Sequence, residues 1–383
     1  MLTVTKKKYT LLRRWFRMCP ARHCLIVIFG LLIGLYFLLR SNRSLMEAVA
    51  QFFVAPWHRA AGKLCSALPF SIGELLIVLG FIAAAAYIVF QAVGFIRHPD
   101  KLKRLYRLIM SAVTVFCVVY GGFCLLWGVY YYTSDFEEQS GIHSRLISTE
   151  ELETVTRYFT ALLSDYAPQV QRDESGVFAE DVEEIFSRSD TLYDAVSLKL
   201  PCLSGQNLKP KPFFFSEALS YMTFTGFFFP FTGEANINVS VPACSIPATI
   251  AHELAHQRGV AQEDRANFVA VLSCLENGDP VYCYSACLMA YTYLGNALYS
   301  ADYEAWLQNY ENLHPLAIAD MRYENSYWAP YRDTVVNSAS DAVYTGFLQS
   351  YGQTEGLKTY GKCVDLLVAY YYEEAAEYLS KVE

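Results

Sequence analysis

The chain has 383 residues, of which 54% are hydrophobic, with a mean hydropathy of +0.19 and a net charge of −8. This composition is unusually apolar for a soluble protein, and it favours membrane-spanning segments joined to a folded domain. The acidic charge disfavours nucleic acid as a partner, because binding to a phosphate backbone depends on basic residues.

Three apolar runs in the first 133 residues predict three transmembrane helices, at about 24–39, 72–96 and 108–131. The second and third reach the roughly 20 residues that cross a bilayer. The first run is shorter and could also be the core of a signal peptide. However, Arg40 and Arg43 follow it directly and no small-residue cleavage site is present, which favours a retained anchor.

Basic residues predict the orientation of these helices. They are dense before the first run and in the short connection 97–107, and sparser in the longer loop 40–71. The positive-inside bias therefore makes the N-terminus and the second connection cytoplasmic. Three spans then place the chain after residue 132 outside the cytoplasmic membrane. The sequence therefore predicts a multi-pass protein of the lipid bilayer.

Charge divides the chain at the same point. Residues 1–133 hold 16 basic and 3 acidic residues, whereas the remainder holds 14 basic and 35 acidic residues. We therefore expect a basic membrane anchor over residues 1–133 and an acidic extracytoplasmic domain over residues 134–383. Six cysteines lie in this second domain, and the sequence leaves disulfides and buried free thiols as open alternatives.

Helical periodicity predicts that the second domain is mainly α with a small β element. "STEELETV" at 148 is a typical helix start. The aromatic and β-branched stretch Tyr221–Pro242, with turn points at Gly226 and at "TG", predicts a β-hairpin or two short strands. The predicted helices span 148–167, 182–186, 193–198, 215–221, 248–258, 262–276, 284–299, 301–313, 333–351 and 359–379.

The helix predicted over 248–258 contains the motif "HELAH". His252 and His256 stand four residues apart, so both imidazoles project from one face and can reach the same ion. Glu253 lies about 100° around the same turn, beside a metal-bound water rather than on the metal. Ser245 and Pro247 mark the start of this helix and Gly259 its end.

A catalytic zinc site needs a third protein ligand, and Glu263 is the best candidate. It lies near the start of the next predicted helix, past Gly259, where a turn can bring its carboxylate back to the metal. Asn267, one turn later, is expected to hydrogen-bond a zinc-bound histidine. Asp264 is a spare donor, and a metzincin layout would need a histidine where Gln262 stands.

The segments "HELAH" and "EDRANF" together resemble the gluzincin layout, in which a glutamate on the next helix completes an H-E-x-x-H zinc site. With "PFTGEANIN" (230–238), "YS" (284–285) and "TYGKCVDLLVAYY" (359–371), they also resemble the bacterial family called domain of unknown function 3810. The resemblance implies a zincin-like domain behind membrane helices. Arg265 stands where that family is expected to have a second glutamate, and Glu263 is intact.

The implied chemistry is zinc-assisted hydrolysis of a peptide or protein. Glu253 acts as the general base and then as the acid, and Tyr284 is the candidate donor to the developing oxyanion. His143 and His314 are alternatives to this tyrosine. The segment "GEANIN" predicts an edge strand that pairs with extended substrate, in which Glu234 and Asn236 face the peptide or else stabilise a turn.

Three functions remain as alternatives. The first is a membrane-anchored zinc metallopeptidase acting outside the cytoplasmic membrane. The second is a zinc-binding but non-catalytic sensory or interaction module of the bacterial envelope, and the third is a membrane scaffold with a vestigial site. The first is favoured, because a purely structural zinc site would not need Glu253.

Overall fold

The fold is described here from a computed structural model, for residues 15–351 and 360–382. The chain forms two compact units. Of the described residues, the first unit comprises those up to Pro56 together with Ile72–Thr133, and the second comprises Trp57–Ser71 together with those from Ser134 onwards. The short segment 57–71, which the sequence analysis assigned to the membrane anchor, thus groups with the second unit.

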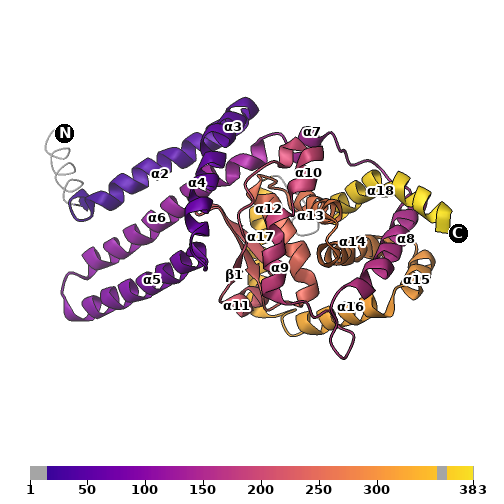
Figure 1. Cartoon of the computed structure of the whole chain (residues 1–383). Helices are drawn as coiled ribbons and strands as arrows, with labels where there is room; N and C mark the ends of the chain where they lie inside the picture. Colours follow the sequence, from indigo (N-terminus) through magenta and orange to yellow (C-terminus); the bar gives the residue numbers. More distant parts are fainter. Residues whose placement is uncertain (1–14, 352–359, 383) are drawn as a thin grey trace. The chain divides into compact units, whose positions relative to one another are not determined.

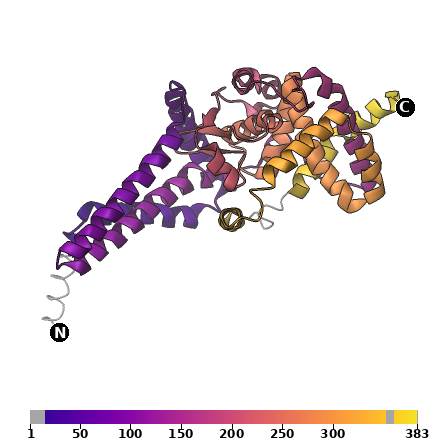
Figure 2. The same cartoon turned by 90° about the horizontal axis from the view of Figure 1, so that it is seen from below.

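Three long helices dominate the first unit, and they lie side by side in both views (Figures 1 and 2). Each is long and apolar enough to cross a membrane. They are α2 (Pro20–Leu39), α5 (Ile72–Arg97) and α6 (Lys101–Leu126), and the shorter α3 (Arg43–Val49) follows α2. Tyr36 of α2 donates a hydrogen bond to the carbonyl of Gly128, 3.0 Å away, which ties α2 to the 3₁₀ turn after α6.

The second unit is mainly helical, as predicted. Ser148 caps α8 with the expected capping box, whereas α16 lies in a stretch for which the sequence predicted no helix. The helices are α4 (Ala55–Ser66, mostly in this unit), α7 (Phe136–Ser140), α8 (Thr149–Tyr166), α9 (Val182–Arg188), α10 (Asp194–Lys199), α11 (Ser216–Tyr221), α12 (Ile246–Gln257), α13 (Glu263–Asn277), α14 (Pro280–Ala301), α15 (Tyr303–Glu311), α16 (Pro315–Trp328), α17 (Val335–Ser350) and α18 (Tyr360–Val382). Thr359, the predicted start of the last helix, lies outside the described residues.

A small sheet of three strands lies beside these helices, in the order β1-β3-β2. The strands β2 (Gly226–Phe229) and β3 (Glu234–Asn238) pair antiparallel, so the predicted hairpin is confirmed. The strand β1 (Lys211–Phe213) was not predicted, and it pairs in parallel with the other side of β3. The prediction that β3 is an edge strand was therefore wrong, because both of its sides are already hydrogen-bonded.

Segment 57–71 packs against the β2–β3 turn. The indole of Trp57 donates to the carbonyl of Phe231 at 3.2 Å, and the ring of His58 meets that of Phe228 edge-on, with centroids 5.1 Å apart. Gly233 in the turn has φ +70°, and a Cβ there would lie 2.5 Å from the carbonyl oxygen of His58. Only glycine fits this close approach.

The core of the second unit gathers around α12, α13 and α14, which α8 and α18 cover. Most apolar side chains of α13 and α14 are buried, although Tyr299 near the end of α14 is exposed. The six cysteines after residue 134 and Cys65 of segment 57–71 carry free thiols, and all seven but Cys202 are buried. Burial raises the pKa values of Cys274 and Cys287 far above the ordinary thiol range, which keeps both thiols protonated and unreactive.

Candidate metal centre

The two helices that carry the motif are joined by a tight reversal. The helix α12 begins after Ser245 and ends at Gln257. Two residues later, Gly259 has a φ of +91°, a conformation that glycine adopts without strain. The amide of Val260 donates back to the carbonyl of Ala255 at 3.2 Å. The next helix, α13, then starts at Glu263 and packs against α12, so its first side chain faces the histidines.

His252, His256 and Glu263 meet at one point. The Oε2 atom of Glu263 lies 3.2 Å from Nε2 of His252 and 3.5 Å from Nε2 of His256. All three candidate ligand atoms lie within 4.8 Å of one another, so this group could hold a metal ion. His252 and Glu263 keep 13% and 25% of their side chains exposed, which leaves the group open to small molecules.

The two nitrogen–oxygen separations are compatible with a bound metal ion such as zinc. Zinc bonds of about 2.0–2.1 Å to nitrogen and about 2.0–2.2 Å to oxygen, at tetrahedral angles, place neighbouring donor atoms about 3.3–3.5 Å apart. The two nitrogen–oxygen distances match this spacing. His256 is also oriented for such a role, because its Nδ1 lies 2.7 Å from the carbonyl oxygen of Val260. A proton on Nδ1 leaves Nε2 free to bind the ion.

Charge within the group favours a cation. Burial alone would lower the pKa of His256, but the carboxylate of Glu263 outweighs it and raises that pKa to about 9. Burial alone would raise the pKa of Glu263, yet the two imidazoles hold it well below its usual range. The metal-free group therefore holds an anionic carboxylate and at least one extra proton, and a divalent ion can take the place of that proton.

Zinc binding should therefore depend on pH. A metal binds only neutral imidazole, so below pH 9 it must displace the proton of His256. We expect uptake at pH 7 to release at least one proton per ion, and the apparent affinity to fall about tenfold for each unit from pH 8 to pH 6. Titration calorimetry in two buffers of different ionisation enthalpy measures this release. An affinity that stays constant from pH 8 to pH 6 would contradict the assignment.

Glu253 lies beside the group and is 3% exposed. Burial raises its pKa to about 7, although both histidines act in the opposite direction. Among the described residues, its Oε2 atom has no hydrogen-bond partner. A buried carboxyl group without a partner costs stability, so its presence here calls for an explanation other than folding.

Gly226 at the start of β2 sets the position of that carboxyl group. A Cβ at this residue would lie 2.8 Å from Oε1 of Glu253 and 2.9 Å from the carbonyl oxygen of Asn236. Any larger side chain must therefore displace Glu253 or the strand. The three atoms nearest to such a Cβ belong to Glu253 and Asn236, and none belongs to His252, His256 or Glu263.

Gly226→Ala should consequently separate activity from metal binding. We expect kcat/KM for hydrolysis to fall about 10- to 100-fold, because a displaced general base loses its alignment with the attacked bond. Zinc content should stay at the wild-type level. Gly361→Ala, where a Cβ meets no atom within 4 Å, is the matched control. Equal kinetics in the two variants would show that Gly226 does not position the base.

Tyr344 of α17 completes the surroundings of Glu263, and the sequence analysis missed it. Its hydroxyl donates to Oε1 of Glu263 at 2.6 Å, and its ring packs against Phe224 with centroids 5.4 Å apart. Asn337, on the same helix, donates to the hydroxyl oxygen of Thr223 at 3.2 Å. One carboxylate oxygen of Glu263 is thus fixed by Tyr344 while the other faces the histidines.

Tyr344→Phe should weaken zinc binding by about 10- to 100-fold, the usual effect of losing a partner that orients a metal ligand. The phenyl ring keeps the packing against Phe224, so the loss is confined to the hydrogen bond. Competition with a chromogenic chelator measures the dissociation constant. Tyr323→Phe, on the exposed face of α16, is the control. Unchanged affinity in Tyr344→Phe would exclude a role for this bond.

Other predicted residues lie elsewhere. Tyr284 is fully buried, donates to a carboxylate oxygen of Asp320 and stacks on Phe178, so it does not join His252, His256 and Glu263. His314 caps α16 through its Nδ1 atom, and His143 is exposed.

Glu234 and Asn236 lie within the central strand β3 and are almost fully buried. The charge of Glu234 acts on the pKa values of Cys65 and Lys211, so this carboxylate faces the protein interior rather than a peptide. Asn267 is buried on α13, one turn after Glu263, and its hydrogen bond to a zinc-bound histidine stays a prediction.

Arg265 stands apart from the metal group. Its guanidinium pairs with Asp264 and Glu137 at 2.6 Å each and with Asp135 at 3.3 Å. This occupies Asp264, the spare donor, and ties the first turn of α13 to α7. Glu263 is the carboxylate that reaches the histidines.

Comparison with known proteins identifies the family of this chain. A family model described as "Protein of unknown function (DUF3810)" matches residues 50–368, which include two of the three long apolar helices and the whole metal group. No curated protein and no solved structure gives a significant match. Because the family model covers most of its length, the chain belongs to the DUF3810 family.

Proposed function

We propose that the protein is a membrane-anchored zinc metallopeptidase. The observation that carries this proposal is the buried carboxyl group of Glu253, whose Oε2 atom has no hydrogen-bond partner among the described residues, beside three residues that could hold a metal. A structural zinc site has no use for such a group, whereas hydrolysis requires a base next to the ion. The nitrogen–oxygen distances support zinc as the ion.

The metal group and Glu253 would have different roles in the reaction. His252, His256 and Glu263 would hold the ion, and a zinc ion there supplies Lewis acidity to a water molecule and to the scissile carbonyl. Glu253 accepts a proton as the water attacks the carbonyl carbon, and it delivers that proton to the amine nitrogen as the C–N bond breaks. A pKa of about 7 suits a group that both takes and gives a proton near neutral pH.

The strand β2 is the element best placed to hold an extended peptide. It lies at the edge of the sheet and begins at Gly226, where an added Cβ would lie 2.8 Å from Oε1 of Glu253. A peptide that adds to this edge by main-chain hydrogen bonds would pass the general base. The substrate-binding role first assigned to β3 is therefore proposed for β2.

We also propose that the second unit lies outside the cytoplasmic membrane. The bias of basic residues places loop 40–71 and the chain after residue 132 on the same, outer side. The grouping of residues 57–71 with the second unit supports this, because segments that pack together must share one side of the bilayer. Protease added to intact spheroplasts should digest the second unit. Protection until the membrane is opened would reverse the orientation.

Digestion of a peptide library tests the activity. The full chain, purified in detergent, is incubated with the library, and new termini are identified by mass spectrometry. We expect cleavage that a chelator stops and that one equivalent of zinc restores. Zinc binding without new termini would instead support a non-catalytic sensory or interaction module.

A further inference from the structure

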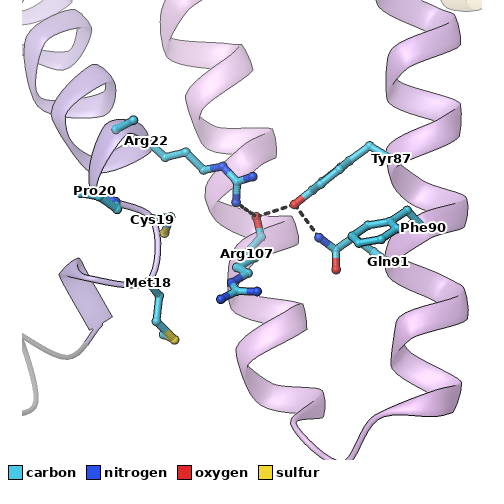
Figure 3. A pocket seen from close by; sticks show the side chains of 9 residues that line it. Met18, Cys19, Pro20, Arg22, Tyr87, Phe90, Gln91 and Arg107 are labelled. Carbon is cyan, nitrogen blue, oxygen red and sulfur yellow. Dashed lines mark hydrogen bonds between the residues drawn. The ribbon is translucent and has the colours of Figure 1, made fainter.

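A cavity in the first unit lies far along the chain from the metal group. It has a volume of about 340 Å³ and is bounded by the start of α2, the later part of α5 and the early part of α6 (Figure 3). The residues used below are Met18, Arg22, Tyr87, Phe90, Gln91 and Arg107. All of these segments belong to the ends of the three long helices at which basic residues are dense.

The described residues provide no carboxylate partner for the basic side chains of this cavity. Arg22 donates to the backbone carbonyl of Arg107 at 3.2 Å, and its guanidinium lies 5.6 Å from the ring centre of Tyr87. Within the described residues, neither Arg22 nor Arg107 pairs with a carboxylate. Two guanidinium groups at one cavity attract a phosphate, which they can bind through several donors at once.

The first turn of α2 adds further donors. This helix of 20 residues has no side-chain cap, and its first turn, from Pro20 to Arg22, lines the cavity. The amides of Ala21 and Arg22 are among those that a helix leaves without an intrahelical partner. Such amides, together with the helix dipole, favour an anion at this position.

Gln91 indicates which other chemical group the ligand carries besides the anion. Its side chain is only 6% exposed, and its Nε2 atom donates to the hydroxyl of Tyr87 at 2.7 Å. Its Oε1 atom has no hydrogen-bond partner among residues 15–351 and 360–382, and Figure 3 shows this oxygen turned away from Tyr87. A buried acceptor without a donor costs stability, so it fits a ligand that brings a hydroxyl group.

The remaining lining is apolar. Met18 and Phe90 border the cavity, which opens among helices able to cross a membrane. A volume near the lower limit of ligand pockets (~300 Å³) suits a phosphate with a glycerol group rather than a whole lipid. A molecule that joins such a headgroup to acyl chains can leave the chains in the bilayer.

We propose that this cavity binds the headgroup of an anionic glycerophospholipid with a free hydroxyl group, as in phosphatidylglycerol. The phosphate lies between Arg22, Arg107 and the first turn of α2, and a headgroup hydroxyl donates to Oε1 of Gln91. Basic pockets between transmembrane helices at the cytoplasmic surface bind anionic lipid headgroups in this way. The site is separate from the metal group and does not depend on the proposed peptidase activity.

Native mass spectrometry of the full chain in detergent tests the proposal, with short-chain phosphatidylglycerol as the probe. We expect it to bind at least tenfold more tightly than phosphatidylcholine of the same chain length. The double variant Arg22→Gln/Arg107→Gln should lose this preference. Arg97→Gln removes a basic residue from the same end of α5 but outside the cavity, and it should retain the preference.

Two further binding measurements identify the ligand. Gln91→Leu should weaken the binding of phosphatidylglycerol at least fivefold. The binding of phosphatidic acid, which has no headgroup hydroxyl, should stay unchanged. Glycerol 3-phosphate alone should bind at least tenfold more weakly than the lipid, and an equal affinity would show that the ligand is soluble. Equal binding of phosphatidylglycerol and phosphatidylcholine, or wild-type binding by the double variant, would contradict the proposal that this cavity binds an anionic headgroup.

Discussion

Glu253→Gln should lower kcat for peptide hydrolysis by about 10²–10⁴-fold, the usual contribution of a general acid–base group. The amide has nearly the shape of the carboxyl group but cannot accept the proton of the attacking water. Because Glu253 lies beside the metal group and is not one of its three members, the variant should hold as much zinc as the wild type. Steady-state kinetics and metal analysis on the same preparation measure both effects.

The stability of this variant offers an independent check. The wild-type group is buried, and its Oε2 atom lacks a partner within the described part of the chain. Replacing an unpartnered carboxyl group by a neutral amide should not lower the free energy of unfolding at pH 8, where the native carboxylate is charged. Activity within twofold of wild type would exclude Glu253 as the base. Loss of zinc would instead make it a ligand.

Glu263→Ala should abolish stoichiometric zinc binding. Its carboxylate oxygen lies within 3.5 Å of both imidazoles, and two histidines alone are a weak zinc site. We expect the zinc affinity to fall by more than the roughly 10- to 100-fold that loss of an outer partner such as Tyr344 would cause. Equilibrium dialysis followed by metal analysis measures the change.

Glu276→Gln is the matched control for this variant. It removes a carboxylate from the same helix, α13, where Glu276 pairs with the exposed Lys199 at the surface. This control should bind zinc as the wild type does. If Glu263→Ala also retains one equivalent of zinc, another residue must be the third ligand. Asp264 is the nearest alternative, although it already pairs with Arg265.

Local sequence signals were sufficient for the central part of the site. The spacing of His252 and His256 fixes their common face, and Gly259 marks the reversal that brings Glu263 back to them. Both features involve residues close together in the chain, for which helix geometry determines the side-chain positions. The three long apolar helices were likewise predictable from composition and length.

Contacts between distant segments were not predictable. Tyr344 is 81 residues from Glu263, and nothing in its surrounding sequence indicates where α17 packs. The alternation in "GEANIN" identifies a strand but not its neighbours, so the short parallel strand β1 was missed and β3 was assigned to an edge. Tyr284 was chosen for its position near a helix start, whereas α14 begins earlier and encloses it in the core.

Segment 57–71 illustrates the same limit. Its position between two apolar runs suggested a simple connecting loop of the membrane anchor. Its partners are instead Phe228 and Phe231, more than 150 residues later in the chain. Pairing at that separation depends on the complete tertiary fold, which a reading of local patterns does not contain.

X-ray absorption at the zinc K edge of the full-length protein tests the central claim most directly. The metal group predicts a first shell made only of nitrogen and oxygen at about 2.0–2.2 Å, with the outer-shell scattering of two imidazoles. Sulfur at about 2.3 Å would assign zinc to the cysteines, and a spectrum without imidazole scattering would remove His252 and His256 from the site. Either result would contradict a zinc centre built from these two histidines and Glu263.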